Sequence, residues 1–201
     1  RVRSSAASDV FKRQDVKIPP TNDSIGKTYQ QEKIPMDYMS RFTPKYSDQT
    51  KFTSGTVQMN VKKVSNSNFD MYTDIEATRK DKAVRFIEKE MLDIQEKLPH
   101  HFQIPKIAVV NFDKHNLNPY AIGGYDKTTN IVYFNSKYDT KEKVLEYVNR
   151  IPGQFANTTE SAPILHELGH KFYEDCIKRL AISENMSYNE SKKMIDRRIY
   201  G

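Results

Sequence analysis

The chain has 201 residues, of which 37% are hydrophobic and 29% charged, enough for one moderate domain with an extension or for two small domains. No apolar run approaches the ~18 residues of a membrane span, and the first residues lack the apolar segment of a signal peptide, so we expect neither membrane contact nor export. The net charge is +6, but Lys and Arg are scattered among acidic residues, which argues against a nucleic-acid partner.

Residues 1–72 are expected to form an extended arm or linker with little core of its own. They are rich in Ser, Thr, Asn, Gln, Lys and Pro, and Pro19, Pro20 and Pro35 interrupt any helical period. One alternating stretch at 56–61 predicts a short strand. A partner can order such a segment without the segment having a core of its own.

Residues 73–201 are expected to form one α+β domain. Apolar residues at steps of three and four predict a helix from Val84 to Leu98, and a strand-length apolar run follows at 107–112. Apolar stretches at 120–125 and 130–135 are separated by turn-forming residues, which predicts a β-hairpin. Further helices are predicted at 141–149, around residues 161–182, and from about Ser187. This order indicates a sheet on one side of the long helix.

The run His166-Glu167-Leu168-Gly169-His170 is the most informative feature of the chain. On a helix, two histidines four residues apart share one face, where a single metal ion can take both nitrogens at about 2.0–2.1 Å. Glu167 projects about a hundred degrees further around the helix and can reach a metal-bound water. This is the H-E-x-x-H arrangement, in which Zn²⁺ lowers the pKa of water toward ~7 and the glutamate takes the proton.

The neighbouring residues predict that the motif lies on a buried helix. Pro163 suits the first turn, and Ser161 is the expected N-cap. An apolar face is formed by Ile164, Leu165, Leu168, Phe172, Cys176 and Leu180. Cys176 is the only cysteine, so no intrachain disulfide can form. Because the chain has only five histidines, this spacing rarely arises by chance. A histidine pair merely packed in a core is the alternative interpretation.

Residues from about 75 to 201 resemble the N-terminal part of a zincin-type metallopeptidase domain. The likeness rests on residues 124–126, residues 130–135 and the helix that contains Leu165 to His170. It is similar, more specifically, to zincin-like domains attached to phage minor head proteins of the Mu F type and to related bacterial toxin domains. The resemblance implies a zincin-like fold, in which a small mixed sheet with an edge hairpin packs on the H-E-x-x-H helix. It also implies a virion or a bacterial cytoplasm as location, and phage-head or toxin-complex partners for the N-terminal arm.

The resemblance also implies where a substrate binds. In zincins the strand before the active helix is usually the sheet edge that lines the cleft, which places residues 130–135 there and makes Asn130, Val132 and Phe134 the expected substrate-binding residues. An exposed edge offers N–H and C=O groups that hold an extended peptide as an added strand. An ordinary core hairpin is the alternative.

A catalytic zinc needs a third protein ligand and an open position. No histidine follows the motif, so the longer metzincin pattern is excluded. Glu190 is the candidate, because it follows Asn189 at a distance from His170 that resembles the Asn-Glu spacing of thermolysin-like gluzincins. Gluzincins have an aspartate four residues after this glutamate, whereas this chain has Met194 at that position. The other options are Glu174, Glu184, Asp196 and a residue beyond Gly201. An oxyanion stabiliser could be Tyr173, Tyr188, Tyr200 or His115.

Two functions follow as hypotheses. The first is a zinc-dependent peptidase in which Glu167 is the general base and then the general acid. The second is a structural virion or phage-head protein that carries an inactive or incomplete zincin-like domain. The sequence starts without a methionine and stops directly after a helix-like pattern. We therefore expect it to be a fragment of a longer chain. A toxin acting on an intracellular target would share the chemistry of the first hypothesis.

Overall fold

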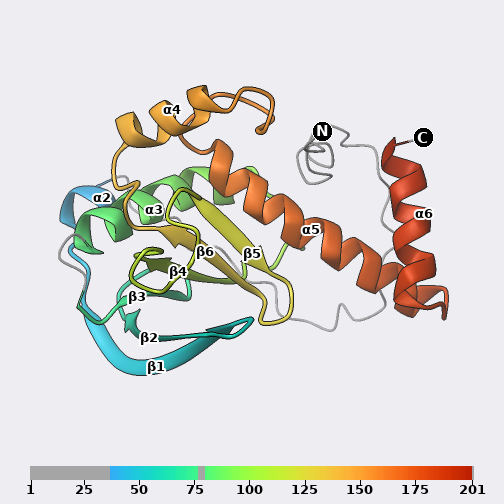
Figure 1. Ribbon diagram of the computed structural model, residues 1–201, viewed down its shortest axis with the longest axis horizontal. Coiled ribbons are helices and arrows are strands. Elements are labelled where there is room, and N and C mark those ends of the chain that lie inside the picture. Colours follow the sequence, from blue (N-terminus) through green and yellow to red (C-terminus); the bar gives the residue numbers. More distant parts are fainter. Residues whose placement is uncertain (1–36, 77–79, 201) are drawn as a thin grey trace.

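A computed structural model describes residues 37–76 and 80–200 of the chain (Figure 1). The described part is mixed α+β, as the sequence predicts, and is built on one sheet. No helix within these two ranges is long and apolar enough to cross a membrane. In chain order the elements are α2 (Tyr38–Arg41), β1 (Tyr46–Ser54), β2 (Val57–Val64), β3 (Met71–Asp74), α3 (Lys80–Gln95), β4 (Lys106–Val110), β5 (Gly123–Asp126), β6 (Ile131–Asn135), α4 (Lys141–Arg150), α5 (Ala162–Ser183) and α6 (Tyr188–Tyr200).

The sheet has six strands in the order β1-β2-β3-β4-β6-β5. Its centre is parallel, because β3 pairs with β4 and β4 with β6 in the same direction, while β1, β2 and β5 pair antiparallel. Parallel strands are normally covered on both faces and read as unbroken apolar runs. This explains why 107–110 and 131–135 are buried throughout.

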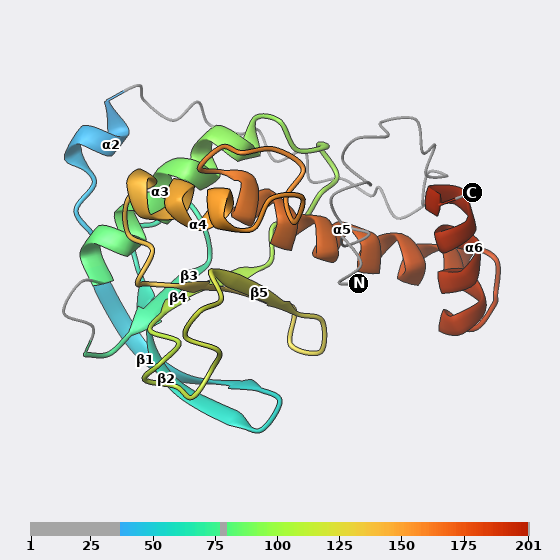
Figure 2. The same cartoon turned by 45° about the horizontal axis from the view of Figure 1, so that its top comes forward.

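The helices α3, α4 and α5 lie on one side of the sheet, and the β1–β2 hairpin curves away on the other (Figures 1 and 2). The main core lies between the sheet and the helices, where Val84 and Met91 of α3 and Leu168 of α5 meet Val132 of β6. A second core on the opposite face is formed by Phe52, Met59, Val61, Tyr72, Ala108, Val110, Phe112, Ile131 and Tyr133. Both faces of the parallel centre are thereby removed from water.

The long helix α5 combines two environments along its length. Its first half packs on the sheet, and its second half extends beyond the sheet and packs on α6 (Figure 2). Pro163 occupies the first turn as predicted, and Ser161 is the N-cap residue, although its side chain makes no capping hydrogen bond. Cys176 is buried between α5 and α6, and burial raises the pKa of its thiol to about 11. This environment fits a packing residue rather than a reactive thiol.

The expectation of an arm over residues 1–72 is wrong for its second half. Residues 46–64 form β1 and β2, which are paired into the sheet, and Phe42, Val64 and Phe69 belong to the main core. The domain therefore includes residues from 37 onward, instead of beginning at 73. The rest of the predicted arm, residues 1–36, lies outside the described residues.

Candidate metal centre

His166 and His170 lie one turn apart on the same face of α5, and their Nε2 atoms are 3.2 Å apart. Two nitrogens bound at 2.0–2.1 Å to one tetrahedral ion are separated by about 3.3 Å. The two rings stand nearly perpendicular, with an interplanar angle of 85°. The helix therefore holds both ring nitrogens at a separation that fits two ligands of one zinc ion.

The protonation of this pair also suits a metal. Burial, followed by the neighbouring His170, lowers the pKa of His166 to about 4. Burial likewise lowers the pKa of His170, while Glu174 acts in the opposite direction. Both imidazoles are therefore neutral at pH 7, which is the form that binds a metal.

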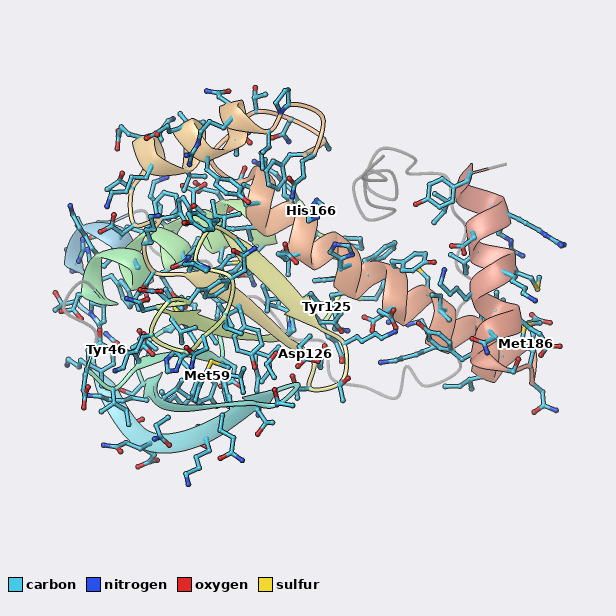
Figure 3. The ribbon with its side chains drawn as sticks, in the orientation of Figure 1. Tyr46, Met59, Tyr125, Asp126, His166 and Met186 are labelled. Atoms are coloured by element: carbon cyan, nitrogen blue, oxygen red, sulfur yellow. The ribbon has the colours of Figure 1, made fainter. Side chains whose placement is uncertain are left out.

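Glu167 points from α5 toward the edge strand β5 and is 7% exposed. Burial raises the pKa of its carboxyl group to about 8, and a backbone hydrogen bond from Tyr125 on β5 acts against this rise. Figure 3 shows Tyr125 on β5 and His166 on the adjacent α5. The side chain of Glu167 thus lies at the contact between α5 and β5.

Aromatic rings line one side of the histidine pair. The ring of Phe155, in the segment between α4 and α5, stands nearly edge-on to His166, with 5.3 Å between ring centroids. Tyr147 of α4 lies 6.3 Å from Phe155 and 5.0 Å from Tyr138. This row of rings connects α4 to the start of α5 and packs one of its members, Phe155, against the His166 imidazole.

A polar cluster lies at the other end, one turn after His170. The Tyr188 hydroxyl lies 2.9 Å from each carboxylate oxygen of Glu174, so α6 is joined to α5 at this point. Lys127, in the β5–β6 turn, lies 3.9 Å from the same carboxylate. Of the four predicted oxyanion stabilisers, Tyr188 is the one bonded to the carboxylate that continues the histidine face. Tyr173 is bonded to Asp196 and His115 to Asp74, and Tyr200 is exposed.

Glu190 does not join the histidine pair in this structure. Its carboxylate accepts hydrogen bonds from the Ser187 amide at 2.9 Å and the Ser187 hydroxyl at 2.7 Å, and its own amide is bonded to that hydroxyl. This is a capping box at the start of α6. Within residues 37–76 and 80–200 no group of three or more His, Cys, Asp or Glu side chains is placed to hold a metal. Both bonds from Ser187 are accepted by Oε2, so the capping box holds the Glu190 side chain at the start of α6.

The predicted edge position of residues 130–135 is wrong. Strand β6 lies between β4 and β5, and the edge strand is β5. Val132 and Phe134 are buried in the main core. Because β6 is also paired with a strand on each side, it has no free edge to which a peptide could bind. Asn130 is exposed in the turn before β6, where its side chain accepts a hydrogen bond from the Tyr125 hydroxyl at 3.1 Å.

Comparison with known proteins identifies no relative of this chain: no protein-family model, no curated protein and no solved structure matches it significantly.

Proposed function

We propose that this protein is a zinc-dependent peptidase of the zincin type, in which His166 and His170 bind Zn²⁺ and Glu167 transfers protons. The observation that carries the proposal is the separation of 3.2 Å between the two Nε2 atoms, on the same helix turn that places Glu167 against the sheet edge. When bound, Zn²⁺ supplies a Lewis acid that lowers the pKa of water and polarises a carbonyl oxygen.

Glu167 is the general base and then the general acid of the proposed reaction. A group that first accepts and then returns a proton works best when its pKa lies near the operating pH. The apolar surroundings of Glu167 raise the pKa of its carboxyl group from 4.5 to about 8, and a bound Zn²⁺ would favour the ionised carboxylate that accepts the proton. The carboxylate would accept a proton from the attacking water and deliver it to the leaving amine.

Strand β5 supports a peptide as the substrate. The Ile122 carbonyl accepts a hydrogen bond from the Asn135 backbone amide. By alternation, the N–H and C=O groups of Gly124 and Asp126 point toward β6, and those of Gly123 and Tyr125 point to the open side of β5. An extended peptide could add to this outer edge by main-chain hydrogen bonds. The outward amide of Tyr125 is already bonded to Glu167, so a peptide would use the remaining outward groups of this edge and would lie beside the proposed base. This proposal moves the substrate from the predicted β6 to its neighbour.

Metal content and activity test the proposal separately. Purified protein should contain one zinc per chain, and His166→Ala and His170→Ala should each lose it. His101→Ala, which changes an exposed histidine outside the motif, should retain it. Glu167→Gln should keep the zinc and reduce peptide hydrolysis by about 10²–10⁴-fold. Normal cleavage by that variant would contradict the proposed base. A wild-type chain that takes up no zinc would contradict the metal site and leave the structural virion role as the remaining hypothesis.

A further inference from the structure

Two consecutive glycines begin the edge strand β5, and they lie in very different surroundings. A Cβ atom added to Gly123 would lie 3.3 Å from Cγ of Glu167, 3.1 Å from the carbonyl oxygen of Tyr133 and 3.2 Å from Cδ1 of Phe134. A Cβ atom added to Gly124 would meet nothing within 4 Å. Successive side chains of a strand point to opposite faces, so only the first glycine faces α5.

We infer that Gly123 is a positioning residue for Glu167, because the missing side chain leaves the space into which the stem of Glu167 fits. Two neighbours of this space cannot easily move aside. The Tyr133 carbonyl is part of the backbone of β6, and Phe134 is 3% exposed within the main core. A methyl group at position 123 therefore requires the stem of Glu167 to yield by a few tenths of an ångström.

The same strand would then determine both ends of the glutamate side chain. Gly123 leaves room for the stem at Cγ, and the backbone of Tyr125, two residues later, bonds to the carboxyl group. A displacement of about 1 Å in a catalytic group can cost ~10²-fold in rate, so a shift of a few tenths of an ångström should cost several-fold. This inference rests on the proposed function only for its catalytic consequence, since the packing of Gly123 against Glu167 does not depend on zinc or on a substrate.

A stability cycle tests the packing without reference to activity. The unfolding equilibrium of the metal-free chain is measured by urea titration for wild type, Gly123→Ala, Glu167→Ala and the double variant. Gly123→Ala should shift the equilibrium toward the unfolded chain, and this shift should be smaller in the Glu167→Ala background, where Cγ is gone while the contacts to Tyr133 and Phe134 remain. Equal shifts in the two backgrounds would overturn the inference, because the strain would then come from Tyr133 and Phe134 alone.

Gly123→Ala could prevent folding, and the double variant then decides. Recovery of folded protein in Gly123→Ala/Glu167→Ala would support the inference, whereas continued failure to fold would overturn it. Gly124→Ala is the matched control on the same strand and should be at least as stable as wild type, because an added Cβ meets nothing there.

The catalytic consequence has its own readout. In zinc-loaded protein, Gly123→Ala should lower kcat by about three- to tenfold, with KM and zinc content within twofold of wild type. Gly124→Ala should leave all three within twofold. An unchanged kcat in folded, zinc-loaded Gly123→Ala would overturn the positioning role. A wild-type chain without peptidase activity would instead refute the proposed function and leave the result of the stability cycle standing.

Discussion

Glu167 should make the stability of the metal-free chain depend on pH in a way that a glutamine at the same position does not. Burial raises the pKa of this carboxyl group from 4.5 to about 8, so between these values the folded chain holds a proton that the unfolded chain has released. The free energy of unfolding therefore falls as pH rises from about 4.5 through 8. At 1.36 kcal/mol for each pH unit, the fall is about 3 to 5 kcal/mol.

The measurement is urea unfolding followed by circular dichroism, with a chelator present, from pH 5 to pH 8.5. The quantity of interest is the free energy of unfolding of wild type minus that of Glu167→Gln at each pH. The lowered pKa values of His166 and His170 have the opposite effect, since the stability that they contribute is present above pH 6.5 and is lost as pH falls below it, toward about 4 for His166. Both histidines are present in both proteins, so their contribution largely cancels.

A difference between the two proteins that stays constant across this range would refute the reasoning. Adding one equivalent of zinc provides a further comparison. A dication near the carboxyl group favours the ionised form and lowers the pKa. The pH dependence attributed to Glu167 should therefore become much smaller when zinc is bound, while Glu167→Gln should show little change in slope.

Three further substitutions test packing and the predicted third ligand. Leu168→Ala should lower the free energy of unfolding by about 2–5 kcal/mol in urea titrations, because this side chain is 1% exposed, whereas Ile182→Ala, at 82% exposure, should change it by less than ~0.5 kcal/mol. Glu88→Ala should cost about 3 kcal/mol, since this buried carboxylate accepts several hydrogen bonds whose donors would lose their partner; the exposed Glu96→Ala is its control, and equal losses would contradict the argument. Glu190→Gln should retain its zinc in metal analysis, because glutamine can keep the capping box, and loss of the metal would instead identify Glu190 as a ligand.

The helices were predictable because each combines a strong apolar period with clear end signals. The predicted helix over 84–98 is α3, residues 141–149 are in α4, and α5 has the apolar face and the proline expected of it. The final helix from about Ser187 was also predicted correctly. In these segments the local pattern and the tertiary packing favour the same structure.

The hairpin β1–β2 shows where local patterns are insufficient. Residues 47–51 of β1 are exposed on both faces of the strand, and Phe52 is its only fully buried side chain. A strand of this kind is stabilised by pairing with its neighbour β2, and the sequence contains no apolar alternation that would indicate it. Because residues 47–51 are all polar, the sequence indicated an extended arm where the structure has the edge strand β1.

The errors at the site had signals in the sequence. The run Ile131-Val132-Tyr133-Phe134 is unbroken, which is typical of a strand buried on both faces rather than of an exposed edge. Ser187 followed three residues later by Glu190 matches the capping-box pattern, which gives the glutamate a local role. The sequence spacing of His166 and His170 correctly predicted that their rings lie close together on one face of a helix, because this depends only on helix geometry. The position of any third ligand depends on how distant elements pack.

The antiparallel pairing of β2 with β3 has a practical consequence for anyone shortening this chain. A fragment that begins at residue 73 would lack β1, β2 and half of β3, and the parallel centre would be left with an open, apolar edge at β4. Exposed edges of this kind recruit strands from other molecules. Such a fragment should aggregate on expression even though it contains the entire motif helix, and a usable shorter version should begin before Phe42, which is 3% exposed in the main core.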